Sequence, residues 1–171
     1  NWNVYHSALG NTKGIRLNLN NAAGTTTQYW NNTSPTATVT TVGINTSHNV
    51  DTKTSLAYSF AAVEGFSAFG SYEGNGNAAG PMVNVGFRPA FVMMKSVDST
   101  SSWYIFDGKR EGYNVDNDAL VADATTVEAT ANAVDLLSNG FKLRIATDPN
   151  VAETFIYAAF AENSLKTANA R

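Results

Sequence analysis

The side chains best suited to binding a cation lie in one short acidic stretch. Asp116 and Asp118 flank Asn117, and Asp123 follows nearby. Hard cations such as Ca²⁺ bind clustered oxygen atoms, but this stretch lacks the glycine and the distal glutamate of an EF-hand loop. We therefore predict a solvated loop without a bound metal or other cofactor. Asp116 and Asp118 are the residues that would hold an ion if one bound.

The sequence contains no pattern that selects a catalytic centre. His6 and His48 stand alone, with no HxH or HExxH motif around either, and no GxSxG motif accompanies the serines. Paired carboxylates could hydrolyse a glycosidic bond, but the spacing selects no pair. The candidate carboxylates are Glu64, Glu73, Asp107 and Glu111. We interpret Asp107 as an ion-pair partner of Arg110, and we predict that the protein is not an enzyme. A polysaccharide-degrading enzyme stays as a third alternative.

Aromatic and asparagine side chains form a second set that could bind a ligand. Aromatic rings stack on the apolar faces of sugars, and amide groups both donate to and accept from hydroxyls. The cluster Tyr29-Trp30-Asn31-Asn32 combines both features and predicts a glycan-binding site. This interpretation requires exposed rings; the alternative is that both rings are core residues. We expect Trp2 and Trp103 to be core residues.

Composition excludes several classes of partner. Charged residues make up only 15% of the 171 residues, the formal charge is −3, and cysteine is absent. An average soluble domain has roughly 25% charged residues, and nucleic-acid binding calls for a basic patch that is missing here. No run of eighteen apolar residues occurs. We therefore expect neither nucleic-acid binding nor membrane insertion, and a neutral surface that suits broad contacts.

The elements that position these residues are predicted to be strands. Residues 15–20 alternate strictly between apolar and polar, and residues 36–42 are rich in β-branched side chains. One short helix is an alternative for residues 125–137, where apolar residues have helical spacing. Other strands are expected at residues 2–5, 55–63, 87–95, 102–106, 120–122, 141–145 and 155–161. Short strands separated by turns predict an all-β sandwich.

The strand signals occur twice, about a hundred residues apart. Trp2-Asn3-Val4-Tyr5 matches Trp103-Tyr104-Ile105-Phe106, and residues 56–61 match residues 156–161. Repetition at a fixed spacing is typical of modular proteins. We therefore predict a jelly-roll-like β-sandwich of two related, packed modules, residues 1–66 and residues 67–171. The first module lacks its opening strands, so we expect the chain to be a processed or trimmed piece of a longer protein.

An incomplete first module has a consequence for strand pairing. A sandwich that lacks a strand exposes an unpaired edge, and such an edge invites a strand from a neighbour. We predict that residues 2–5 or residues 87–95 lie at an edge that another subunit or the sister module covers.

The second half of the chain carries a series of short motifs in a fixed order. They are G-S-Y-E-G-N-G at 70–76, G-F-R-P-A-F-V-M-M-K at 86–95, W-Y-I-F-D at 103–107 with Arg110, Gly112 and Tyr113, L-S-N-G-F-K-L at 137–143 and Y-A-A-F-A-E at 157–162. This series resembles a repeat module of tailed-bacteriophage tail-fibre-like and other virion surface structural proteins. The resemblance covers residues 67–171 as a whole module and residues 1–66 as the later part of one. Glu111 departs from the pattern because it splits the usual Arg-Gly pair.

The resemblance implies a place on the virion surface and brings no catalytic residues. Together with the duplication, it predicts a non-enzymatic bacteriophage virion surface protein: a tail fibre, a spike or a capsid decoration subunit. Its expected partners are other virion proteins and further copies of itself. The alternative function is a carbohydrate-binding receptor-recognition module, which would attach the particle to a host cell-surface glycan.

Overall fold

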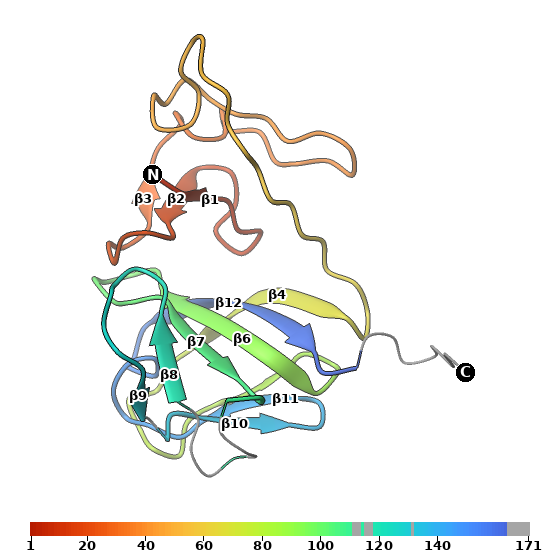
Figure 1. The fold of residues 1–171 in the computed structure, drawn as a ribbon, viewed down its shortest axis with the longest axis vertical. Coiled ribbons are helices and arrows are strands. Elements are labelled where there is room, and N and C mark those ends of the chain that lie inside the picture. Colours follow the sequence, from red (N-terminus) through yellow and green to blue (C-terminus); the bar gives the residue numbers. More distant parts are fainter. Residues whose placement is uncertain (111–113, 115–117, 131, 164–171) are drawn as a thin grey trace.

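A computed structural model describes residues 1–110, 114, 118–130 and 132–163 (Figure 1). The described residues form twelve strands in three antiparallel sheets and contain no helix. The predicted all-β, sandwich-like fold is therefore confirmed. None of the described residues belongs to a helix that could cross a bilayer.

The largest sheet has six strands in the order β4-β12-β6-β7-β8-β9. These strands are β4 (Ser67–Glu73), β6 (Pro89–Ser96), β7 (Tyr104–Asp107), β8 (Asp118–Val121), β9 (Ala129–Thr130) and β12 (Thr154–Ala161). The long strands β6 and β12 form its centre, and β4 is one of its outer strands. Figure 1 shows this sheet as the middle of the molecule.

A three-stranded sheet lies against the inner face of the six-stranded sheet. It consists of β5 (Met82–Asn84), β10 (Val134–Leu137) and β11 (Gly140–Leu143), in the order β10-β11-β5. Successive side chains of a strand point to opposite faces, so alternate residues of β12 enter the core. Phe155, Tyr157 and Ala159 pack there with Phe141 from the smaller sheet. The sandwich core therefore lies between these two sheets.

The N-terminal segment forms a third layer on the outer face of the six-stranded sheet. Its strands are β1 (Asn3–Val4), β2 (Lys13–Arg16) and β3 (Gly24–Thr25). Ile15 of β2 packs with Val97, Trp103 and Ile156, and these side chains form a second buried cluster. Since Ile156 alternates with the inward-facing residues of β12, this cluster lies on the opposite side of the sheet from the sandwich core.

Several expected elements differ from the structure. Residues 36–42 and 55–63 form no strand, because β-branched and alternating residues produce a strand only when a neighbour offers backbone partners. The helix considered for residues 125–137 is absent from the described residues of that range, which contain β9 and β10. The prediction that residues 87–95 lie at an edge is wrong, since β6 lies between β12 and β7. Strand β1 is an outer strand of its sheet. That another subunit or the sister module covers its edge stays a prediction.

The matching segments of the two halves have different surroundings. Trp103 is 5% exposed, which confirms its core position, whereas Trp2 is 53% exposed and is not a core residue. Residues 156–161 lie in the interior strand β12, whereas residues 56–61 belong to no strand. The division into two modules therefore stays a prediction from the sequence, although the N-terminal sheet and the sandwich do pack together.

Candidate interaction surface

The most unusual feature of the fold is a long exposed segment that leads into β4. All residues from 49 to 64 are exposed. Between Lys53, whose N–H bonds to Val50, and the single bridge from Val63 to Ser67, the described chain shows no backbone–backbone hydrogen bond. Figure 1 shows the segment as a long trace from the N-terminal loops to the start of β4. The Ala61 carbonyl accepts from the Ser67 hydroxyl at 2.7 Å, but no backbone group of this stretch bonds to another backbone group.

This segment carries large apolar side chains at every second position. Leu56, Tyr58 and Phe60 are 70%, 67% and 66% exposed. Alternation of this kind is the pattern of a strand with one buried face. Monomeric soluble proteins rarely expose contiguous apolar patches larger than a few hundred Å², and a larger patch marks an interaction site. We call residues 55–61 the exposed strand segment.

Aromatic contacts connect the exposed strand segment to the rest of the molecule at two points. The ring of Tyr58 stacks on Trp2, with centroids 6.2 Å apart and an interplanar angle of 17°. Phe60 lies edge-on to Phe160 at 5.6 Å and 6.5 Å from Phe69. These contacts connect the segment to the N-terminal layer at one point and to the sandwich at the other, while Tyr58 and Phe60 stay largely exposed.

The aromatic residues around Phe60 belong to the outer face of the six-stranded sheet. Phe160 contacts Phe66, Phe69 and Phe91, with ring centroids between 5.8 and 6.3 Å apart. The N-terminal sheet covers the other end of this face, where Ile156 lies. The aromatic end and the exposed strand segment together form one partly exposed apolar surface.

The two aromatic residues of the predicted glycan site are buried. Tyr29 and Trp30 are 7% and 6% exposed. The Trp30 Nε1 donates to the Lys13 carbonyl at 2.9 Å, and the His48 ring stacks on Trp30 with a centroid distance of 5.7 Å. The interpretation of these rings as an exposed stacking platform is therefore wrong, because they form the core of the N-terminal layer.

The two asparagines of that cluster do lie at the surface. Asn31 and Asn32 are exposed, and both have a φ of 50°, in the left-handed region that asparagine tolerates better than most residues. They form the turn that follows the buried rings. Of the predicted glycan site, only these two amides are exposed, and the aromatic rings that should stack on a sugar are buried.

The predicted cation stretch lies only partly within the described residues. Asp116 is outside them, and Asp118 is buried at the start of β8. Asp123 accepts hydrogen bonds from the Trp103 N–H at 2.7 Å and from the Ser102 hydroxyl at 3.2 Å. No group of three potential ligands able to hold a metal occurs among the described residues. Asp123 thus helps to fix the start of β7.

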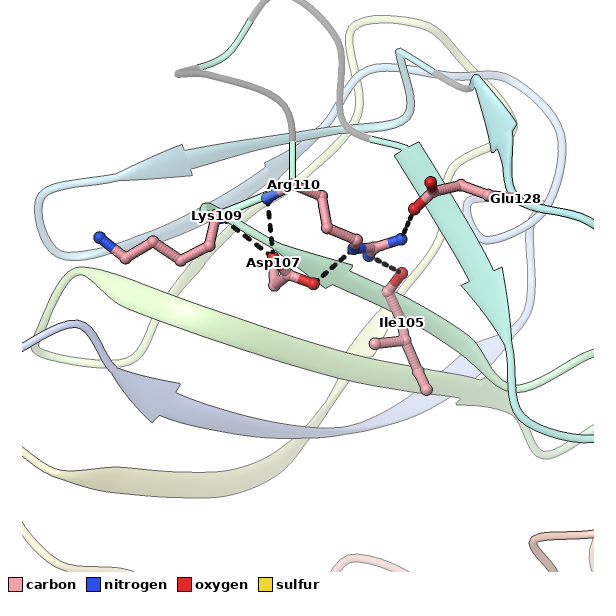
Figure 2. A network of polar contacts seen from close by, with 5 residues as sticks. All are labelled: Ile105, Asp107, Lys109, Arg110 and Glu128. Atoms are coloured by element: carbon pink, nitrogen blue, oxygen red, sulfur yellow. Dashed lines mark hydrogen bonds and ion pairs between the residues drawn. The ribbon is translucent and has the colours of Figure 1, made fainter.

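Asp107 and Arg110 form the predicted ion pair, and Figure 2 shows the network around them. The Arg110 Nε donates to Asp107 at 2.5 Å, while the backbone N–H groups of Lys109 and Arg110 donate to the other carboxylate oxygen. The guanidinium also bonds to Glu128 and to the Ile105 carbonyl. Burial favours the neutral acid, but the bonds from Arg110 and Lys109 outweigh it and lower the pKa of Asp107. This carboxylate is held in a turn and is not free for acid–base chemistry.

Among the other carboxylates considered for catalysis, Glu73 bonds to a different residue than Asp107. Glu73 accepts a hydrogen bond from the Thr154 hydroxyl at 3.2 Å, and Glu111 lies outside the described residues. A small pocket beside Asp107 is lined by Arg88, Lys109 and Glu162, among others. Glu162 pairs with Arg88 at 3.0 Å and with Lys109 at 3.5 Å, so this carboxylate is bound by two cations.

A buried lysine near the end of β6 was not among the residues predicted from the sequence to be functional. The Lys95 side chain has no exposed surface, and its Nζ donates to the Ser96 carbonyl at 2.6 Å. Burial lowers its pKa to about 8, although the carboxylates of Asp123, Asp148 and Glu153 favour the charged form. Lys95 thus acts as an internal cation that binds the chain between β6 and β7. The apolar residues that precede Lys95 could have indicated that it is buried, but a lysine at the end of a strand is normally solvated.

His6 is the second buried ionisable group that supports the outer face. Its Nε2 lies 3.0 Å from the Tyr157 carbonyl and therefore donates, and its Nδ1 accepts from the Ala8 N–H at 3.2 Å. Burial lowers the pKa of His6, and the bond to Tyr157 opposes that shift. Both ring nitrogens are used by the neutral form, which gives His6 a structural role.

Comparison with known proteins yields one match. The model of a family described as "Domain of unknown function (DUF7483)" matches residues 1–164. The comparisons with curated proteins and with solved structures found no match. The matched range includes both the N-terminal sheet and the sandwich.

Proposed function

The chain belongs to the DUF7483 family, and we propose that it functions by contact, as a non-enzymatic structural protein on the surface of a bacteriophage virion. Within the particle it would serve as a tail fibre, a spike or a capsid decoration subunit. The location rests on the resemblance of residues 67–171 to the repeat module of virion surface proteins. The mode of action rests on the structure of the exposed strand segment.

One observation carries the proposal of function by contact. Leu56, Tyr58 and Phe60 are each about two-thirds exposed, on a segment whose backbone is unpaired. Covering such a surface with a partner stabilises the complex, by about 25 cal/mol for each Å² of apolar area removed from water. A protein that stays alone in solution gains nothing from this arrangement, whereas an assembly subunit does.

The polar groups of the fold support the same conclusion. Asp107, Lys95 and His6 each bond to backbone groups and hold the layers or turns in place. The carbohydrate-binding alternative depended on the rings of Tyr29 and Trp30, and their burial removes its site.

Immunogold electron microscopy of purified phage particles tests the proposal. Antibodies raised against this chain should label particles of the source phage at a fixed position, on the tail, at its tip or over the capsid. Mass spectrometry of the same gradient-purified particles should detect the chain in a constant ratio to the major capsid protein. Particles that lack the chain would overturn the proposal.

A further inference from the structure

We propose that the exposed strand segment, residues 55–61, forms an intermolecular β-strand along the free edge of β4 in a second copy of this chain. The inference deepens the proposed function by contact and rests on it, since it names the partner of the same surface. Four observations support it: an unpaired donor, an unpaired acceptor edge, a sequence match between the donor and the normal partner of that edge, and a tether that holds donor and edge apart within one chain.

The donor is a strand in every respect except pairing. It has apolar residues at alternate positions, all of its residues are exposed, and no described backbone–backbone hydrogen bond involves it. Its one described backbone contact is the Ala61 carbonyl, which accepts from the Ser67 hydroxyl at 2.7 Å. An isolated strand in water has no stability of its own, because its backbone groups and its apolar face both need a neighbour. A partner sheet supplies both.

The acceptor is the outer edge of β4. Ser67 exchanges two hydrogen bonds with Val63, one of 2.9 Å and one of 3.0 Å, so its backbone groups point away from β12. In an antiparallel sheet every second residue points the same way. The N–H and C=O groups of Phe69 and Ser71 therefore face outward as well. No described strand lies beyond them, because β4 ends the sheet.

The sequence of the donor matches that of the strand which already pairs with β4. Residues 56–61 read L-A-Y-S-F-A, and residues 156–161 of β12 read I-Y-A-A-F-A. Strand β12 pairs antiparallel with β4 over its whole length, with Phe160 opposite Ser67 and Ile156 opposite Ser71. A strand of this composition is therefore compatible with β4, and both elements are seven residues long.

Pairing within one chain is opposed by the contacts at the far end of the segment. Tyr58 stacks on Trp2, and the Ser55 hydroxyl donates to the His48 carbonyl at 3.0 Å. These contacts hold the segment against the N-terminal layer, so the hairpin that begins at Val63 and Ser67 stops after one bridge. A second copy can reach the segment without breaking them, and each copy offers both a donor and an edge. Exchange between two copies leaves neither strand unpaired.

Sedimentation velocity of the full chain over a wide concentration range tests this inference. We expect a reversible dimer. Ser59→Pro removes an N–H from the middle of the donor and should weaken the dimer at least about tenfold. The matched control is Thr40→Pro, which places proline at another exposed position whose N–H makes no described backbone hydrogen bond, and it should leave association unchanged. Thermal unfolding checks that both variants fold.

Disulfide cross-linking identifies the contact itself, because the chain has no cysteine. Ser59→Cys and Ser71→Cys place one thiol near the middle of the donor and one on the edge of β4. Oxidation of a mixture of the two single variants should give a heterodimer, and each variant mixed with Thr40→Cys should not. A chain that stays monomeric at every concentration, or a dimer that Ser59→Pro leaves intact, would overturn the inference. Either result leaves the location in the virion to be decided by immunogold labelling.

Discussion

The indole Nε1 of Trp103 donates a hydrogen bond of 2.8 Å to the carbonyl oxygen of Arg16. Trp103 directly precedes β7 of the sandwich, and Arg16 ends β2 of the N-terminal sheet. Trp103 lies with Ile15 and Ile156 in the buried cluster between the layers, and Arg16 is the partly buried residue that follows Ile15. This bond therefore joins the N-terminal layer to the sandwich at a point from which water is largely excluded.

Trp103→Phe should destabilise the fold by about 1–3 kcal/mol, because it removes the indole bond to the Arg16 carbonyl at a partly buried site and leaves only the longer bond of 3.4 Å from the Leu19 N–H. Chemical denaturation followed by circular dichroism measures this change. Trp2→Phe is the matched control, since Trp2 is 53% exposed, and it should change the stability by no more than about 0.5 kcal/mol. Equal effects of the two substitutions would contradict the assignment of Trp103 to the interface.

The sandwich itself was predictable from the sequence because each of its strands has a partner. Apolar and aromatic runs between turns located β6, β7 and β12 to within a few residues, and period-two alternation located β11. Residues 55–63 were also predicted to form a strand, but the structure pairs them with no neighbouring strand. Alternation reports which face of a strand is apolar, but pairing also requires an available edge, and this is a property of the tertiary structure.

The burial of Tyr29 and Trp30 could not be read from their types. An aromatic pair followed by two asparagines looks the same in a sugar site and in a core that ends at a turn. The deciding feature lies elsewhere in the chain: the Tyr29 ring packs directly on Gly14, where any Cβ would overlap it. The predicted ion pair between Asp107 and Arg110, by contrast, was correct, because both residues lie within one local turn.

Lys95 should make stability rise with pH in mildly alkaline solution. Its pKa is lowered to about 8 in the folded protein, from 10.5 in the unfolded chain. Between these values the unfolded chain binds more protons, so the free energy of unfolding increases with pH, on the order of 1 kcal/mol per pH unit. Above about pH 10 the buried tyrosines reverse the trend, since burial raises the pKa of Tyr72, Tyr104 and Tyr157.

Denaturation at pH 8, 9 and 10 measures the effect of Lys95. The slope should disappear in Lys95→Met, which keeps the side-chain length but removes the ionisable group. An unchanged slope in this variant would assign the pH dependence to another residue.

His6 should make stability fall in mildly acidic solution. The lowered pKa of His6 means that the unfolded chain takes up a proton first as the pH drops below 6.5. The contribution is complete above that pH and is lost as the pH falls through the folded pKa. The physical reason is that burial disfavours the charged imidazolium, although the hydrogen bond to the Tyr157 carbonyl opposes this shift of the pKa.

His6→Gln should flatten the stability profile between pH 7 and pH 5, because glutamine can still donate to the Tyr157 carbonyl but does not titrate. Comparison of the denaturation midpoints at the two pH values measures the effect. A profile as steep as that of the unmodified chain would show that His6 is not the group that titrates.

Asp107→Asn should loosen the turn after β7 and destabilise the fold by about 1 kcal/mol, because the neutral amide loses its charged bond to Arg110. Asp107 has a lowered pKa, so its contribution is present above pH 3.8 and declines as the pH falls through the folded value. The difference between the two proteins should therefore shrink in acid. Asp51→Asn removes the same charge from an exposed position and is the matched control, with an expected change within about 0.5 kcal/mol. A difference that persists undiminished at pH 2 would mean that the carboxylate charge is not what holds this turn.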